Sequence, residues 1–157
     1  MPETAPTDTD PTLAEIRAEL AGMEDEGMRA VNERHGDAHS VNLTALRRAW
    51  IADPDPVVAS AGWALTSHVL RKGEEELDVP AVLDVIEAQM AAASERLQWA
   101  MNETLATIGI EVPELRERAL AIGERLGVLR DYPTPAGCTS PFAPAWIAEM
   151  VRRREEG

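Results

Sequence analysis

Apolar residues recur every three or four positions along most of the chain, which is the spacing of one face of an α-helix. The pattern is clearest between Pro56 and Lys72, where Val58, Trp63, Leu65, Val69 and Leu70 are the apolar positions. No stretch alternates apolar and polar residues in the two-residue rhythm of a half-buried strand, and residues 108–112 form the only short β-like run. The pattern therefore predicts an all-α fold.

Capping residues, prolines and glycines give the expected helix boundaries. Aspartate, asparagine or serine precedes several apolar runs, and glycine or a basic last turn closes several of them. These signals predict seven or eight helices, one of which, from Ser94, is expected to close at Gly109. The expected helices are 11–21, 23–34, 43–51, 56–72, 78–90, 94–109, 113–126 and a last one that carries Trp146, Ile147, Val151 and the basic end Arg152-Arg153-Arg154.

An internal repeat is visible in two similar tripeptides, Trp63-Ala64-Leu65 and Trp99-Ala100-Met101, which lie 36 residues apart. This is the period of a two-helix unit, and units of this length stack into an α-solenoid of HEAT-like repeats. A chance coincidence of two tryptophans is the alternative explanation.

Two regions differ in composition from the helical part. Residues 1–10 contain too little apolar surface to order themselves and are expected to be a disordered tail, which leaves residues 11–157 as a single helical repeat domain. Residues 128–144 form a loop rich in proline and glycine, and the aromatic content of that loop is unusual for a plain linker.

The formal net charge of −13 favours solubility and opposes polyanion binding, although a local basic face can exist on an acidic chain. The single cysteine, Cys138, excludes an intrachain disulfide and is expected to be a small buried thiol. No segment approaches the roughly 18 consecutive apolar residues of a membrane span, and the first ten residues lack a signal-peptide pattern. We expect a cytoplasmic protein without a membrane partner.

Few residues suggest a catalytic, metal or nucleic-acid-binding site. The three histidines, His35, His39 and His68, have no ligands at convincing spacing, so no metal and no cofactor is expected. Asp53 and Asp55 are expected to cap helices rather than to form a catalytic pair. The tryptophans suit either the core or base stacking, and the arginine clusters suit either phosphates or helix ends. Candidate nucleic-acid-binding residues are Arg47, Arg48, Trp63, Arg71, Trp99 and Asn102.

The C-terminal stretch resembles a branch of the bacterial DNA alkylation repair protein family, the AlkD-like proteins. The resemblance is carried by 118–124, by 129–133, by 137–147, by Gln98-Trp99-Ala100-Met101-Asn102, by Ala61-Gly62-Trp63-Ala64-Leu65-Thr66, and by Met28-Arg29-Ala30 with Asn32 and His35-Gly36. It implies HEAT-like repeats around duplex DNA and, in active relatives, an N-glycosylase that removes alkylated purines.

The chain is shorter than the family pattern. Relatives carry several additional helices between the segments that match 28–39 and 43–55, and the family's catalytic aspartate lies in that portion. The resemblance therefore assigns the catalytic acid to no residue here, and we expect a catalytically impaired protein that at most binds duplex DNA. The alternative is a protein-interaction scaffold without DNA affinity, with a protein partner or self-association through Leu43–Ile51.

Overall fold

The computed structural model describes residues 18, 22, 43–73 and 77–157. The chain divides into two compact units, Met1–Leu46 and Arg47–Gly157. The helix Leu43–Ile51 spans the boundary between the two units, and all later described residues belong to the second unit. The expected tail 1–10 lies outside the described residues, so the single-domain boundary at residue 11 stays a prediction.

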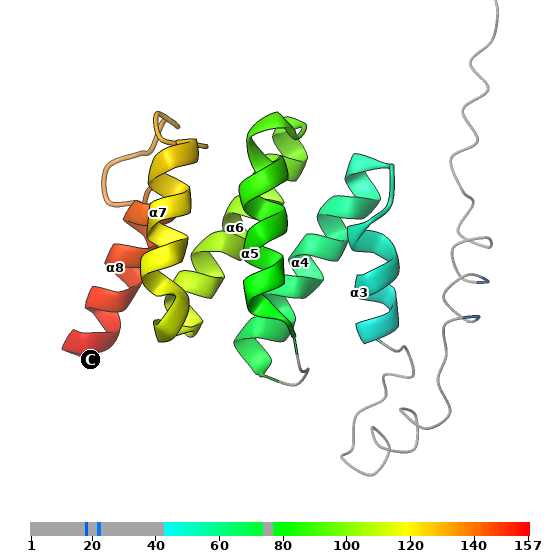
Figure 1. The fold of residues 1–157 in the computed structure, drawn as a ribbon. Helices are drawn as coiled ribbons and strands as arrows, with labels where there is room; N and C mark the ends of the chain where they lie inside the picture. The colour runs from blue at the N-terminus through cyan, green and yellow to red at the C-terminus, as the bar shows by residue number, and fades with distance from the viewer. Residues whose placement is uncertain (1–17, 19–21, 23–42, 74–76) are drawn as a thin grey trace, which may run out of the picture. The chain divides into compact units, whose positions relative to one another are not determined.

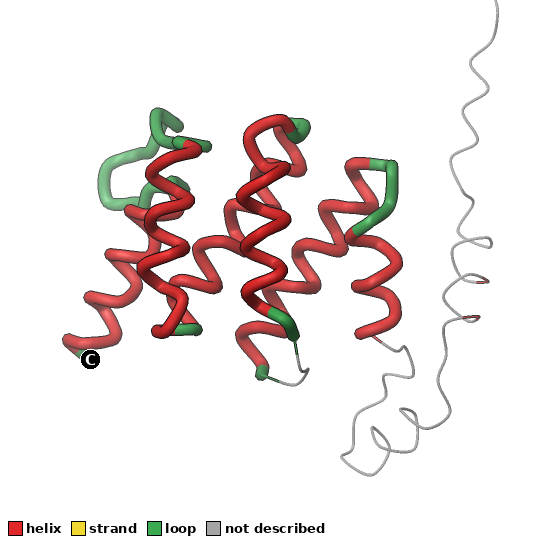
Figure 2. The backbone as a smooth tube through the Cα atoms, viewed as in Figure 1, coloured by secondary structure: helices red, strands yellow, loops and turns green. Residues whose placement is uncertain are grey.

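The described residues contain six α-helices and two short 3-10 helices and no strand, which confirms the predicted all-α fold (Figure 2). The expected helices 11–21 and 23–34 lie outside the described residues, so the predicted total of seven or eight is not tested. The observed elements are α3 Leu43–Ile51, α4 Pro56–Lys72, α5 Val79–Gln89, η1 Met90–Ala92, α6 Glu95–Glu111, η2 Pro113–Leu115, α7 Arg116–Leu126 and α8 Ala143–Glu156.

Two aspartates fix the N-terminal end of α4 and the turn before it. A carboxylate oxygen of Asp55 accepts a hydrogen bond from the Val57 amide at 2.7 Å, and Asp53 accepts one from the Asp55 amide at 2.8 Å. These bonds satisfy amides that have no partner inside the helix. Asp55 is thus a helix cap, as predicted, whereas Asp53 stabilises the turn before the helix.

One predicted helix end was wrong. Helix α6 does not close at Gly109 but continues to Glu111, so the β-like run 108–112 is almost entirely helical. Gly109 is instead a packing position, because an added Cβ would lie 2.8 Å from Cγ1 of Ile147 in α8. The helix ends beyond it at Val112 and Pro113, since proline cannot donate the next helical hydrogen bond.

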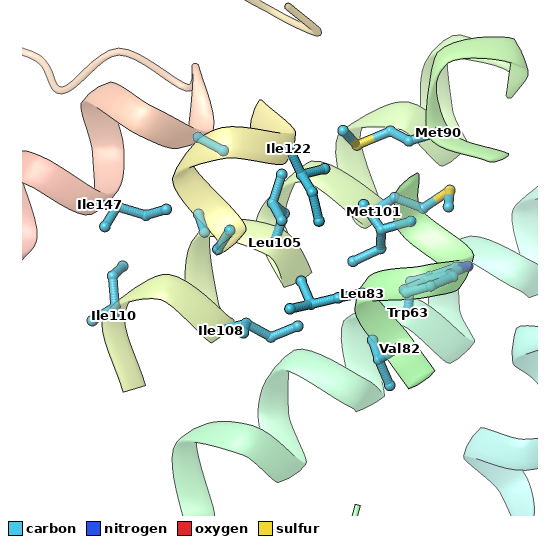
Figure 3. Close-up of a cluster of buried hydrophobic side chains, with 14 residues drawn as sticks. Trp63, Val82, Leu83, Met90, Met101, Leu105, Ile108, Ile110, Ile122 and Ile147 are labelled. Atoms are coloured by element: carbon cyan, nitrogen blue, oxygen red, sulfur yellow. The ribbon is translucent and has the colours of Figure 1, made fainter. Parts of the chain in front are cut away.

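Within the second unit, α4, α6 and α8 lie next to one another in that order, and α5 and α7 cross them on one side (Figure 1). Helix α6 is central and contacts α4, α5, α7 and α8. The buried core lies around it, and its largest members include Leu83, Ile86, Met101, Leu105 and Ile147 (Figure 3). Trp63 belongs to this core and is only 3% exposed.

Buried hydroxyl groups hold α4 against α6. The hydroxyls of Ser67 and Thr104 lie 2.9 Å apart, and that of Thr104 also donates to the Trp63 carbonyl at 3.1 Å. Small side chains allow two helices to approach closely, and the shared hydrogen bonds offset the cost of burying the hydroxyls. This contact fixes the register of the two helices and so brings Ser60 of α4 beside the start of α6.

Candidate nucleic-acid interface

A groove of about 500 Å³ lies where α4 meets the first half of α6. Trp99, which is half-buried, forms part of its wall, and Glu95 and Glu103 flank Trp99 one helical turn before and after it. We call this hollow the Trp99 groove. Its lining residues are Ser60, Glu95, Arg96, Trp99, Ala100 and Glu103.

The charges of the groove are unevenly compensated. An Arg71 guanidinium nitrogen lies 2.7 Å from Glu103 Oε1 and 3.2 Å from the Thr107 hydroxyl, so α4 neutralises one of the two carboxylates. Within residues 43–73 and 77–157, Glu95 and Arg96 form no ion pair. The groove thus offers an aromatic ring, one uncompensated carboxylate and one uncompensated guanidinium.

A second hollow of about 360 Å³ shares Trp99 with the groove as a lining residue. Its aromatic walls are Trp99, Tyr132 and Trp146, and the Trp99 and Tyr132 rings meet edge-to-face with centroids 5.1 Å apart. We call it the aromatic hollow. The remaining lining residues belong to the loop before α8: Pro133, Thr134, Pro135, Cys138, Thr139, Ser140 and Pro141.

Both ends of this loop are held by specific contacts. The Arg130 guanidinium lies 4.6 Å from the centroid of the Phe142 ring and donates to the Glu124 carbonyl at 2.8 Å. At the other end, the Asn102 side chain donates to the Pro141 carbonyl at 2.8 Å. These contacts place Tyr132 over α6, and they make the hollow a fixed feature of the fold.

The structure separates the predicted binding residues into different roles. Trp63 and Asn102 are buried, at 3% and 1% exposure, so both serve packing and neither offers a surface to DNA. For Trp63 the core interpretation holds, and for Asn102 the loop contact replaces the predicted nucleic-acid role. Of the six candidates, only Trp99 lines the groove, while Arg71 reaches it through Glu103.

The remaining two candidates, Arg47 and Arg48, are in α3. Arg47 is buried at 6% exposure and Arg48 is exposed, and neither is among the residues that line the groove. Both take part in interactions within the fold. Their role in DNA binding stays a prediction.

Sequence reasoning missed the residues that surround Trp99. Glu95, Arg96 and Glu103 lie four before, three before and four after Trp99, which places them near it on α6, and this spacing was a usable signal. Tyr132 and Trp146 gave no such signal, because only the folded loop brings them to Trp99. Cys138 was expected to be buried and is exposed, since it lines the hollow from a surface loop.

The basic C-terminal end is engaged by carboxylates. Arg152 and Arg153 both donate to Glu149, at 2.9 and 2.7 Å, and these bonds lower the pKa of Glu149 to about 2. Arg154 pairs with Glu111 at 2.7 Å, which raises the pKa of Arg154. The cluster therefore ties α8 to itself and to the end of α6.

The described part of the chain holds neither a metal-binding cluster nor a membrane-spanning helix. No group of three or more histidine, cysteine, aspartate or glutamate residues is arranged there to hold a metal ion, and His35 and His39 lie outside it. No helix of residues 43–73 and 77–157 is long and apolar enough to cross a membrane.

Comparison with known proteins gave one match. The family model described as DNA alkylation repair enzyme matches residues 17–147. Neither the curated proteins nor the solved structures contain a match to the chain.

Proposed function

Because the chain belongs to the DNA alkylation repair enzyme family, we propose that it binds alkylated DNA through the Trp99 groove and does not remove the alkylated base efficiently itself. Alkylation of a ring nitrogen leaves a purine with a positive charge spread over a flat aromatic system. The groove offers the two kinds of group that attract such a ring: an aromatic side chain and carboxylates.

The observation that supports this proposal is the position of Trp99 between Glu95 and Glu103 on one exposed face of α6. A cation over an indole ring gains about 0.5–1 kcal/mol at an exposed site and about 2 when it is desolvated. Glu95 adds a negative charge without an ion pair among the described residues, and the equally unpaired Arg96 of the same groove is available to the phosphate of the bound nucleotide. The groove volume of about 500 Å³ is ample for one nucleobase with its sugar.

The proposed lack of efficient base removal follows from the ion pair that Glu103 forms with Arg71. Departure of a base leaves positive charge on the sugar, which a nearby anionic carboxylate would stabilise. Arg71 already pairs with Glu103 at 2.7 Å, so the net charge of that pair is zero. Glu95, in the first turn of α6, lies near the positive end of the helix dipole, which further weakens its field.

The arrangement of the helices supports a HEAT-like solenoid as the scaffold of this groove. Trp63 and Trp99, separated by 36 residues, lie on the neighbouring helices α4 and α6, and the helices between them in sequence cross on one side (Figure 1). Stacked two-helix repeats have this order of layers.

The proposal is tested with fluorescently labelled duplexes that carry one cationic methylpurine or none, by anisotropy at low and at moderate salt. We expect tighter binding of the alkylated duplex, and we expect Trp99→Leu to weaken it about tenfold through the loss of stacking. Trp50→Leu is the matched control, because it removes a half-buried tryptophan outside the groove. Equal affinity for both duplexes, or an equal loss in both variants while circular dichroism shows both folded, contradicts the proposal.

Release of the methylated base from the same duplex separates binding from catalysis. We expect release at the spontaneous rate, with or without saturating protein. A protein-dependent increase of tenfold or more that Glu103→Gln abolishes would overturn the inactive assignment while leaving the binding site in place.

One observation favours the alternative scaffold function. The described arginines of α7 and α8, apart from Arg116, which binds carbonyl groups, are ion-paired, which leaves little positive charge for a DNA backbone. A protein that binds neither duplex at low salt, while remaining folded, is the result that this alternative predicts.

A further inference from the structure

The aromatic hollow has no role in the proposed binding of the alkylated base. It is separated from the Trp99 groove by Trp99 itself, which lines both. Two further rings, Tyr132 and Trp146, line it, and Tyr132 is 46% exposed. One exposed ring and two half-buried rings, Trp99 and Trp146, that line one hollow are a platform on which a flat ligand can stack.

The arginines around the hollow are paired with carboxylates, which disfavours a recognition mode that depends on phosphate groups. Arg130, at the start of the loop, pairs with Glu124 at 2.9 Å, and Arg153, beside Thr139, pairs with Glu149. Proteins that grip duplex DNA use several uncompensated cations on its phosphates. A ligand of this hollow must therefore be held mainly through its aromatic faces.

We propose that the aromatic hollow binds an unpaired nucleobase of single-stranded DNA, adjacent on the same strand to the nucleotide in the Trp99 groove. The inference rests on the proposed function for its choice of ligand. Because Trp99 is the shared wall, the neighbouring nucleotide of a strand that enters the groove is the ligand nearest to the hollow. The volume of about 360 Å³ is large enough for a purine or a pyrimidine.

The polar groups of the hollow fit a ligand of variable sequence. Thr139 and Ser140 are among its lining residues, and a hydroxyl can donate or accept a hydrogen bond. No charged side chain is among the lining residues, so nothing there selects a particular base edge. Stacking on aromatic rings is equally tolerant, because every base has a π-face. We therefore expect the hollow to bind an unpaired base of any identity.

The test compares binding of a labelled ten-thymine oligonucleotide with binding of an unmodified duplex of equal length, by anisotropy at low salt. We expect the single strand to bind more tightly. Tyr132→Ala should weaken the single strand by about fivefold or more, since one stacked base contributes about 1–3 kcal/mol. Tyr132→Phe, which keeps the ring, should stay within about twofold, as should Val85→Ala, a surface control on α5.

Cys138 provides a second readout that does not need a substitution. It is exposed and lines the hollow, and it is the only cysteine of the chain, so a maleimide reacts at one known place. The ten-thymine oligonucleotide should slow this modification, and the modified protein should lose affinity for the single strand.

Each outcome decides the inference. Unchanged single-strand affinity in Tyr132→Ala, or unprotected Cys138 at saturating oligonucleotide, overturns it, even if Trp99→Leu abolishes binding of alkylated duplex and the proposed function stands. Conversely, failure of the alkylated duplex to bind, with Tyr132-dependent single-strand binding intact, overturns the proposed function and leaves the hollow as a base-binding site. A proline-rich peptide is the last comparison. If it protects Cys138 from the maleimide without displacing the bound oligonucleotide, the peptide occupies the hollow and the oligonucleotide does not, which also overturns the inference.

Discussion

At the scale of single residues, identical side chains have different roles because burial differs. Trp63 and Trp99 occupy equivalent places in the internal repeat, yet Trp63 is core and Trp99 is half-buried at the groove. Trp63 is enclosed in the core cluster beneath α6, whereas Trp99 lines two surface hollows and is covered only in part, on one edge by the Tyr132 ring. Sequence alone gives both residues the same candidate role.

Breaking the Arg71–Glu103 ion pair by mutation of Arg71 is expected to increase the affinity for alkylated duplex DNA. Arg71→Gln removes the compensating charge, so Glu103 becomes a second anionic group beside Trp99. We expect the alkylated, cationic duplex to bind about 2- to 5-fold more tightly, the size of one exposed charge interaction. Arg118→Gln is the control, because it removes an arginine that pairs with Asp84 and Glu87 and so also frees carboxylates, but away from the groove. Anisotropy titrations measure both, and equal behaviour of the two variants would rule out the electrostatic role of Glu103.

Substitution of Gly62 by alanine is expected to cause a large loss of stability. An added Cβ would lie 2.7 Å from both the Ile51 Cα and the Trp50 carbonyl carbon, and these backbone atoms can only move together with α3. We expect Gly62→Ala to lower the free energy of unfolding by about 3 kcal/mol, the upper end for overpacking. Gly109→Ala meets the Ile147 side chain instead and should cost about 1–2 kcal/mol. Urea denaturation measures both, and a larger loss in Gly109→Ala would contradict this ranking.

At the scale of elements, helix bounds set by local caps were predictable, whereas the passage of α6 through Gly109 was not. Asp55 and Asp78 cap α4 and α5 through bonds within three residues, so the local sequence carries the whole signal. The role of Gly109 inside α6 depends on residues outside the local pattern: Ile147 of α8 fills the space beside it, and Arg116 donates to its carbonyl at 2.7 Å. A glycine that serves helix packing therefore resembles a helix stop when only its neighbours are known.

Helix α8 predicts a pH dependence with a defined window. Glu149 accepts hydrogen bonds from Arg152 and Arg153, which lower its pKa from 4.5 to about 2 in the folded chain. Since a lowered pKa means that folding favours the carboxylate, the contribution of Glu149 to stability is present above about pH 4.5 and is lost between there and about pH 2.

Thermal unfolding of Glu149→Gln and of the unchanged chain from pH 7 downward measures this effect. The midpoint of the variant should be lower at pH 7, and the difference should shrink below about pH 4.5. Glu155→Gln, on the same helix and without an ion pair among the described residues, should show a smaller difference. A constant gap between Glu149→Gln and the unchanged chain down to pH 2 would refute the assignment.

At the scale of the whole molecule, the distribution of charge predicts a shallow salt dependence. Among residues 43–73 and 77–157, Lys72 and Arg96 carry no ion pair and no carbonyl contact, so they are the cations most available to phosphates. One or two such contacts correspond to about a 3- to 7-fold loss of single-strand affinity between 50 and 200 mM salt. Anisotropy across this range is the measurement, and a loss of about a thousandfold would show that arginines now paired with carboxylates are released to bind DNA.

Local signals in the sequence determined the all-α fold, most helix bounds and, through scattered motifs, the family. Helical periodicity and capping act over a few residues, so they can be recognised in the sequence without knowledge of the tertiary structure. Tertiary structure alone decided which tryptophan is accessible, that Asn102 holds the loop at Pro141, and that Arg71 neutralises Glu103. Each of these depends on contacts between residues at least 32 positions apart, which the register of packed helices sets and no local pattern encodes.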